Sequence, residues 1–334
     1  MVKIAVDLGS EYITIFSKGL GVVLKEPSVV ALTKLRKKSA LIAAGSKALK
    51  MLNRPEKGCN VVFPIGDGAI KNIEAAILMF QEFFIKVSSQ SFIRQRVDVL
   101  AAVSCGLTVA ERRDIELALN RAGANQITLI EAPPTVFQLG NKDNALILII
   151  GKHLTEAAIV SDEGIIMGCS LDIAGDAMNK AIMDYIALKY RVLIGNYAAE
   201  KVKISIGSMY ENDMSTIEVN GKDLVENAPK SIEITASDVR KALTPLLDKL
   251  VEVIDSLMCS CPDTILDEVY RNGIYLAGGS AQLPGIGDYL GLRCKMTATV
   301  INDPVNAVAT GAGSLLNDEN SLKRILNAAD GGTL

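Results

Sequence analysis

The sequence has no tryptophan, and aromatic residues make up only 4% of its 334 residues. Surfaces that bind bases or sugars rely on stacked aromatic side chains, so both of these functions are disfavoured. Basic residues are not in excess either, because 35 Lys and Arg stand against 38 Asp and Glu, for a net charge of −3. We therefore expect no nucleic acid partner.

Cysteine spacing and apolar runs exclude further classes of protein. Of the six cysteines only Cys259 and Cys261 lie close together, so neither a zinc-ligand spacing nor a disulfide framework is present. The sequence has no run of 18 apolar residues, and residues 1–9 form a strand pattern rather than a basic, then apolar, leader. We expect a cytoplasmic protein with reduced thiols and no membrane-spanning segment.

Apolar residues are abundant at 49%, and the chain is long enough for two compact lobes. β-Branched runs at residues 2–7, 13–17 and 22–24 predict a three-stranded meander, and the same outline returns 142 positions later. This shift places residues 7–10 on residues 149–152. We therefore predict two related α/β lobes, each with a loop after its first strand.

The rest of the chain alternates helical and strand patterns, which is typical of a largely parallel sheet. Thr108 and Glu111 form a capping box, and Ser237 is the expected cap of a long helix bent at Pro245. Charged residues at 34–38 and after residue 318 predict solvent-exposed surface. The expected helices span 73–87, 108–121, 176–190, 198–206, 237–259 and 307–316, and the later strands span 98–104, 126–130, 147–150, 157–160, 215–224, 231–235 and 273–277.

Two glycine-containing loops have the pattern of a phosphate site. Asp7, Gly9 and Ser10 follow the first strand; the N–H groups of such a turn can hold phosphate oxygens, and the carboxylate can bind a hydrated divalent cation. The pattern also occurs in ordinary hairpins, so alone it decides little. Gly278 and Gly279, directly after an apolar strand, allow a ligand to approach the backbone closely.

In their order along the chain, these segments resemble the superfamily of actin, the heat-shock chaperone ATPases and the sugar kinases. Within it they are most similar to the bacterial actin-like MreB family, since residues 21–31 read GVVLKEPSVVA where the family reads GIVLNEPSVVA. The similarity runs almost from end to end, which makes it more specific than any one motif. Other matching segments are ERRDI at 111–115, LIEAP at 129–133, IAGD at 173–176, AEKVKISIG at 199–207 and GIYLAGG at 273–279.

The resemblance implies an actin-like α/β fold in which two lobes with duplicated RNase H-like cores flank a nucleotide cleft. It implies ATP or ADP with Mg as cofactors in a cytoplasmic, membrane-peripheral protein. The implied partners are copies of the same chain in a filament, the inner face of the cytoplasmic membrane, and membrane proteins of the cell-wall or cell-shape machinery. The implied subdomains are IA (1–32, 73–143 and 308–334), IB (33–72), IIA (144–178 and 244–307) and IIB (179–243).

Site residues carry over position by position. Asp7 is the implied ligand of Mg, through water, while Glu11 and Tyr12 replace a small residue and an Asn of the family's first phosphate loop. Glu200 and Lys203 match the helix residues that contact the nucleoside. The implied nucleotide-binding residues are Asp7, Gly9, Ser10, Glu11, Tyr12, Gly151, Lys152, His153, Leu154, Glu200, Lys201, Val202, Lys203, Gly278, Gly279, Ser280, Ala281, Gln282 and Leu283.

The second phosphate loop departs from the family. The family reads DIGGGTTE, whereas residues 149–156 read IIGKHLTE, so an Asp that would help to hold Mg is Ile149. Two glycines and a hydroxyl residue become Lys152, His153 and Leu154, whose side chains stand where phosphate would approach the backbone. Lys152 either acts as a cation for phosphate or turns to solvent. His153 is the only histidine, and because no orienting carboxylate is evident, loss of constraint explains it better than a general-base role.

A carboxylate that orients the attacking water in relatives is missing as well. The family's IEEP turn reads IEAP here, which leaves Ala132 at the position of that Glu. Glu131 is the candidate substitute, although neighbouring side chains usually point apart. Hydrolysis of a phosphoanhydride depends on positioning water and stabilising charge, so we expect catalysis to suffer more than binding.

Phe92 and Ile93 lie where MreB proteins carry a short hydrophobic loop that inserts into the bilayer; packing against their own domain is the alternative.

Three hypotheses for the function follow. The leading one is a membrane-associated filament subunit that binds ATP or ADP and hydrolyses it slowly or not at all. The second is a pseudo-actin that no longer uses nucleotide. The third, a small-molecule kinase or chaperone ATPase, ranks last because the chain lacks a peptide-binding domain.

Overall fold

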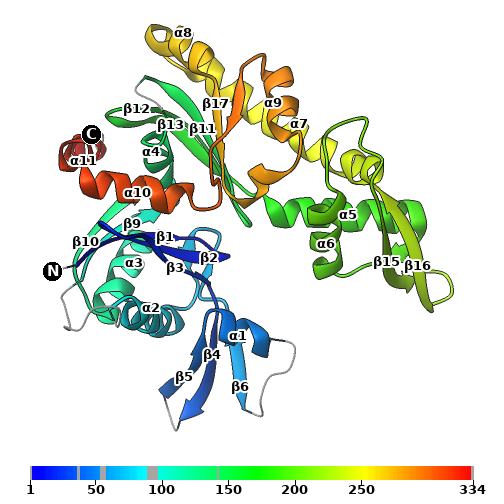
Figure 1. The fold of residues 1–334 in the computed structure, drawn as a ribbon, viewed down its shortest axis with the longest axis horizontal. Coiled ribbons are helices and arrows are strands. Elements are labelled where there is room, and N and C mark those ends of the chain that lie inside the picture. Colours follow the sequence, from blue (N-terminus) through cyan, green and yellow to red (C-terminus); the bar gives the residue numbers. More distant parts are fainter. Residues whose placement is uncertain (1, 36–37, 53–57, 89–96, 141–142, 332–334) are drawn as a thin grey trace. The chain divides into compact units, whose positions relative to one another are not determined.

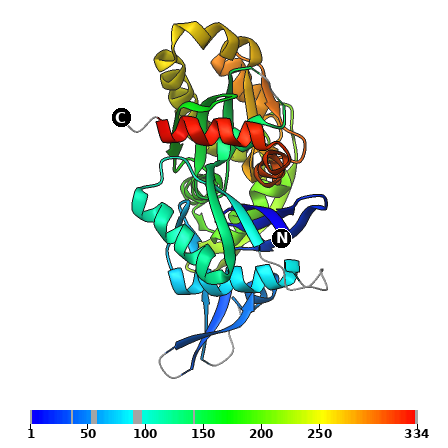
Figure 2. The same ribbon diagram turned by 90° about the vertical axis from the view of Figure 1, so that its left-hand side faces the viewer.

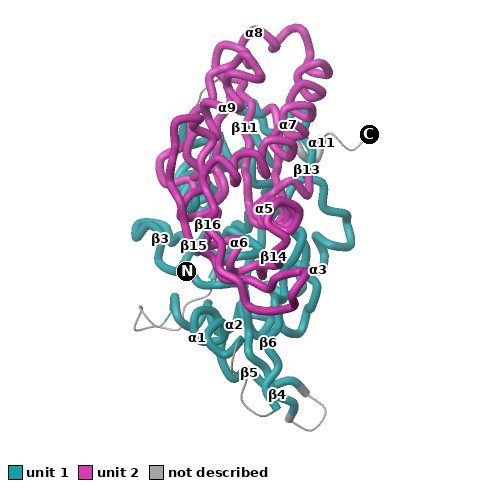
Figure 3. Tube along the Cα trace, turned by 90° about the vertical axis from the view of Figure 1, so that its right-hand side faces the viewer, with its two compact units in different colours: residues 1–142, 160–170, 305–334 teal, residues 143–159, 171–304 magenta. Residues whose placement is uncertain are grey.

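The computed structural model describes residues 2–35, 38–52, 58–88, 97–140 and 143–331. The chain divides into two compact units (Figure 3): unit 1 contains residues 1–142, 160–170 and 305–334, and unit 2 contains residues 143–159 and 171–304. The finer division into four subdomains stays a prediction.

The first five-stranded sheet has the order β10-β9-β1-β2-β3 (Figure 1). β1 pairs antiparallel with β2, and β2 with β3, which confirms the predicted meander. β1, β9 and β10 are parallel to one another. The sheet is therefore mixed rather than largely parallel, because short turns can join only antiparallel neighbours. The bounds are β1 Val2–Leu8, β2 Tyr12–Ser17, β3 Gly21–Pro27, β9 Val97–Val103 and β10 Ala124–Glu131.

The second five-stranded sheet repeats this arrangement, with the order β13-β12-β11-β17-β18. β11 takes the place of β1. Its parallel neighbour β17 takes the place of β9, and β18, which pairs in parallel with β17, takes the place of β10. The duplication predicted from the 142-residue shift is thus present in the strand order. The bounds are β11 Ala145–Ile150, β12 Thr155–Ser161, β13 Gly164–Leu171, β17 Ile274–Ala277 and β18 Ala298–Val300.

Helices α2 and α3 supply the core of unit 1, where Phe80 and Phe83 are buried with Ile4 and Ile13 of the sheet. The capping box of Thr108 and α3 forms as predicted. The bounds in unit 1 are β4 Val30–Leu35, β5 Lys38–Ala44, α1 Ser46–Met51, β6 Cys59–Val62, β7 Ile65–Gly66, β8 Ala69–Ile70, α2 Ile73–Ser88, α3 Val109–Ala122, α4 Ala132–Phe137, α10 Ala307–Asn317 and α11 Glu319–Gly331.

The charged segment after residue 318 is more ordered than the sequence suggested. It forms α11, which runs crosswise to α10 (Figure 2). Ile325 is only 4% exposed, and Arg324 pairs with Asp162 at 3.0 Å. The prediction of a purely solvent-exposed tail is therefore wrong, because apolar residues at helical spacing bury one face of a polar helix.

Unit 2 contains the long helix α7, whose cap differs from the prediction. Thr235, not Ser237, accepts the Asp238 N–H, and Asp238 bonds back to Thr235. Burial alone would raise the pKa of Asp238, but hydrogen bonds donated by Lys189, Tyr190 and Thr235 lower it to about 2. The other bounds are α5 Gly175–Tyr190, β14 Val192–Leu193, α6 Asn196–Ile206, β15 Thr216–Asp223, β16 Pro229–Thr235, α7 Ala236–Ser260, α8 Asp263–Asn272, a 3-10 helix Gly279–Gln282 and α9 Ile286–Cys294.

Candidate functional site

The loops after β1 and β11 share one backbone geometry. A Cβ atom on Gly9 would lie 2.6 Å from the Tyr12 carbonyl oxygen, and a Cβ atom on Gly151 would lie 2.8 Å from the Leu154 carbonyl oxygen. Both separations are shorter than a carbon–oxygen contact allows, so each loop needs glycine at its first position. The duplication therefore extends to the turns themselves.

Asp7 in unit 1 lies near the end of β1, paired with Thr14 of β2 and Ala102 of β9. Burial raises the pKa of the Asp7 carboxyl to about 7, although the charge of Lys25 acts in the opposite direction. A bound cation would favour the ionised carboxylate. Ser10 and Glu11 follow as half-buried residues, and Tyr12, which begins β2, is exposed with the Lys25 ammonium 5.3 Å from its ring centroid.

The second loop is tied to the N-terminal turn of α5 within unit 2. The Gly151 carbonyl accepts hydrogen bonds from the Gly175 N–H at 3.1 Å and the Ser280 hydroxyl at 3.0 Å. The Lys152 carbonyl accepts the Asp176 N–H at 2.8 Å. Ile149, at the position of the family's Asp, is buried near the end of β11.

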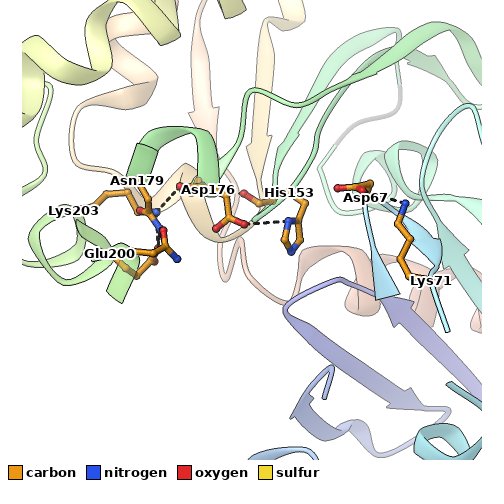
Figure 4. Close-up of polar contacts among 11 residues, drawn as sticks. Asp67, Lys71, His153, Asp176, Asn179, Glu200 and Lys203 are labelled. Carbon is orange, nitrogen blue, oxygen red and sulfur yellow. Dashed lines mark hydrogen bonds and ion pairs between the residues drawn. The ribbon is translucent and has the colours of Figure 1, made fainter. Parts of the chain in front are cut away.

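His153 has the orienting carboxylate that the sequence did not reveal. Its Nδ1 atom lies 3.1 Å from Oδ2 of Asp176, in the first turn of α5 (Figure 4). The view that His153 lacks such a partner is therefore wrong. The two residues are far apart in the sequence, and only the packing of the loop against α5 brings them together.

Helix α6 contributes a charged pair to the same end of α5 (Figure 4). Lys203 Nζ donates to the Gly175 carbonyl at 3.1 Å and to Glu200 Oε2 at 3.0 Å. The Asn179 amide also donates to Glu200. Burial alone would raise the pKa of Glu200, but the Asn179 hydrogen bond and the nearby lysine charges hold it below its usual value. Of the neighbouring predicted residues, Lys201 is exposed and Val202 is fully buried.

The glycine loop after β17 completes this cluster in unit 2. Gly278 has φ +88, and a Cβ atom there would lie 2.4 Å from the Ile150 carbonyl oxygen, so only glycine fits. The chain then forms the 3-10 helix, in which Gly279 precedes Ser280, whose hydroxyl reaches the second loop. Ala281 and Leu283 are buried and Gln282 is exposed. The structure thus brings together all three unit 2 segments that the resemblance implicates.

Glu131 ends β10 in unit 1, and its Oε1 atom lies 2.8 Å from the Arg112 guanidinium. The Gly106 N–H donates to the same oxygen at 3.5 Å. Ala132 begins α4 and is buried. The two neighbours therefore differ in their surroundings: Glu131 is held in an ion pair, and Ala132 offers no polar group.

The predicted membrane residues Phe92 and Ile93 lie outside the described residues. In the part of the chain that the structure describes, no helix is both long and apolar enough to cross a bilayer. The same residues contain no group of three or more His, Cys, Asp or Glu side chains placed to hold a metal ion. All six cysteines have free thiols.

Sequence reasoning missed two residues of the unit 2 cluster, Asp176 and Asn179. Both lie on the first turns of α5, three positions apart, and therefore on one face of the helix. Asp176 Oδ1 and Asn179 Oδ1 are buried and have no hydrogen-bond partner. The IAGD match contained Asp176, but only the contact with the second loop reveals what it touches.

Comparison with known proteins identifies the family. The MreB/Mbl protein family model matches residues 1–324. The cell shape-determining protein MreB of Escherichia coli (strain K12) is 33% identical over 321 residues, which cover 94% of this chain and 92% of that protein.

Solved structures agree with this assignment. MreB5 of Spiroplasma citri bound to ADP has a TM-score of 0.86 and 28% identity, covering 96% of this chain and 98% of that one. The same protein bound to AMPPNP has a TM-score of 0.84 and 27% identity, covering 98% of both chains. The MamK double helical filament, at 18% identity, a TM-score of 0.79 and coverage of 95% and 98%, shows the actin-like fold alone. With this fold and a family match over nearly its whole length, the chain belongs to the MreB/Mbl family.

Proposed function

We propose that the chain is a cytoskeletal subunit that binds ADP or ATP and assembles with copies of itself into filaments that take part in cell-shape determination. Its relatives are named as cell shape-determining proteins. The observation that carries nucleotide binding is the unit 2 cluster around the start of α5, in a chain similar to MreB5 structures that hold ADP and AMPPNP.

The donors and acceptors of this cluster suit a nucleoside phosphate. Asp176 Oδ1 and Asn179 Oδ1 are buried acceptors without donors, and ribose hydroxyls can supply such donors. Glu200 and Lys203 offer an acceptor and a cation beside them. The N-terminal end of the 16-residue helix α5 favours negative charge, as a phosphate chain requires. We assign the nucleoside to α6 and residues 278–283, and phosphate to residues 151–154, all within unit 2. For residues 9–12 of unit 1, phosphate binding is proposed separately, on the resemblance alone.

Magnesium is proposed at Asp7, through water. Protein sites usually hold Mg with one or two carboxylates while phosphates and waters supply the other ligands, so a single Asp7 suffices. Burial raises the pKa of its carboxyl, and a bound cation would offset this by favouring the ionised form. When bound, the ion would neutralise charge on the phosphates. In unit 2 the buried side chain of Ile149 supplies no second carboxylate.

Hydrolysis is proposed to be slow or absent. Ala132 has no group that could orient water, and Glu131 is engaged by Arg112. Loss of one positioned polar group commonly slows an enzyme by about 100-fold or more. Binding does not depend on these two positions and is expected to persist.

Titration with a fluorescent ADP analogue tests nucleotide binding directly. Lys203→Gln removes a cation that is paired within the cluster, and we expect about tenfold weaker binding. Lys180→Gln, an exposed position on the same helix as Asp176, is the matched control and should bind like the wild type. The absence of wild-type binding up to millimolar concentration would overturn the proposal.

The altered second loop favours one alternative, a pseudo-actin that assembles without nucleotide. Sedimentation with and without ATP separates the two: a nucleotide-dependent pellet supports the first proposal, and equal pellets support the second.

Attachment to the inner face of the cytoplasmic membrane is proposed through Phe92 and Ile93. Liposome co-sedimentation of preformed filaments should fall for Phe92→Ser with Ile93→Ser, and equal binding by that variant would exclude this loop.

A further inference from the structure

The His153–Asp176 pair is the feature of the site that neither the family pattern nor the fold requires. The family has glycine at the position of His153, so this imidazole is particular to the chain. Nδ1 faces Asp176 Oδ2 at 3.1 Å. With Nδ1 turned toward a carboxylate, the other ring nitrogen, Nε2, is the one left to meet a ligand.

The turn that carries this imidazole is fixed by three sets of hydrogen bonds. The Gly151 N–H donates to the Leu154 carbonyl at 2.9 Å, which closes the turn. The Gly151 and Lys152 carbonyls accept N–H groups from the start of α5, and Ser280 adds a hydroxyl donor. A ring on a fixed turn loses less conformational freedom on binding than one on a loose loop.

We propose that His153 binds a phosphate oxygen of the nucleotide through Nε2, and that nucleotide binding is coupled to uptake of one proton by this imidazole. The inference rests on the proposed nucleotide binding and adds a protonation step to it. In this proposal Nδ1 stays turned toward Asp176, Nε2 takes a proton from solvent, and the new N–H donates to phosphate. Asp176 is a positioning residue that fixes the ring and favours the charged form.

The charged groups at the start of α5, where the ring lies, are of both signs. Lys152 precedes it in the loop, Asp176 faces it from α5, and Glu200 and Lys203 form an ion pair on α6. Imidazole is the side chain that most readily gains and loses charge in the physiological pH range. Because a phosphate adds negative charge, it favours the protonated ring, and by linkage the protonated ring favours phosphate.

The test uses the untagged full chain and measures the Kd for ADP between pH 5.5 and 8.5. From pH 8 to pH 6 we expect wild-type affinity to rise about tenfold more than that of His153→Gln, the gain of one charge-assisted hydrogen bond. Asp176→Asn keeps an acceptor without the charge and should shift this rise to lower pH. Asp184→Asn, the same change at an exposed position of α5, should follow the wild type. Titration of the ADP phosphates themselves is common to all four proteins.

A second measurement exploits the single histidine of the chain. In protein labelled at histidine, the imidazole NMR signals report one residue, and we expect their change with pH to move to higher pH when ADP is added. A titration unchanged by ADP, or parallel pH profiles for wild type and His153→Gln, would overturn the inference and leave nucleotide binding intact. If no protein binds ADP at any pH, both proposals fail.

Discussion

The loops at residues 9–12 and 151–154 are copies of one turn that now carry different chemistry. Gly9 and Gly151 each meet a carbonyl oxygen three residues ahead so closely that no side chain fits. Beside the first loop stands Asp7, and beside the second stands Ile149. The backbone requirement has been retained in both copies, and the carboxylate only in one.

The difference teaches that the fold and the ligand constrain separate atoms. A turn of this shape needs a glycine, whichever ligand it meets. Phosphate, in contrast, can be neutralised either by a cation on a carboxylate or by a cationic side chain. In the function that we propose, Asp7 of the first loop serves the former, and Lys152 and the His153–Asp176 pair of the second loop serve the latter.

The largest expected effect tests the shared turn. Gly9→Ala and Gly151→Ala should each lower the free energy of unfolding by about 3 kcal/mol, because the added Cβ forces the backbone to shift. Urea unfolding at pH 7 measures the loss. The control is Gly66→Ala, whose Cβ would meet only the Lys71 side chain at 3.4 Å and should change stability little. If Gly151→Ala left the free energy of unfolding unchanged while Gly9→Ala lowered it, the second turn would not require glycine.

The next test restores what the second lobe and the IEAP turn have lost. Ala132→Glu combined with Ile149→Asp should raise phosphate release from ATP about tenfold or more, because both missing carboxylates return. Ala132→Gln with Ile149→Asn is the matched control, of similar size without charge. If the wild type releases phosphate as fast as the carboxylate variant, the two positions do not limit hydrolysis.

How much of this could be predicted differs between the fold and the site. The strand meander, its copy and the α3 cap followed from local patterns, because alternation and capping residues act over a few positions. The cap of α7 was misplaced by two residues, since Thr235 and Ser237 are both suitable and only the partner at Asp238 decides. Helix α11 was not predicted because its many charged residues favoured an exposed tail, although Ile325 among them is buried.

In the site, the residues could be named but their contacts could not. The resemblance supplied Glu200, Lys203 and the glycine loop by alignment alone. It did not supply Asp176 as the partner of His153, because that contact depends on how a loop packs on a helix that begins 22 residues later. Where a residue has no counterpart in the family, as His153 has none, the family pattern cannot predict its contacts.

A smaller effect concerns Asp7, the carboxylate of the first loop. Its folded-state pKa of about 7 lies above the unfolded value near 4, so the folded state holds the proton more tightly. In nucleotide-free and Mg-free protein, the unfolding free energy should therefore fall by about 2–3 kcal/mol between pH 4 and pH 7. Asp7→Asn should lose this dependence, as seen in urea midpoints across that range. Asp67→Asn, at an exposed ion pair with Lys71 (Figure 4), should keep it; parallel curves for all three would contradict the assignment.

The smallest effect concerns Lys152, the cation of the second loop. Lys152→Gln should weaken ATP binding about threefold to fivefold, because a partly solvated cation contributes at most about 1 kcal/mol to an exposed contact. The wild type should also lose more affinity than this variant between 50 and 300 mM salt, since added ions screen the charge of Lys152. Lys180→Gln, on the exposed face of α5, should match the wild type in both respects. Equal affinity and equal salt dependence for Lys152→Gln would mean that the second loop has no cation for phosphate at this position, and that the two loops differ only by what the second has lost.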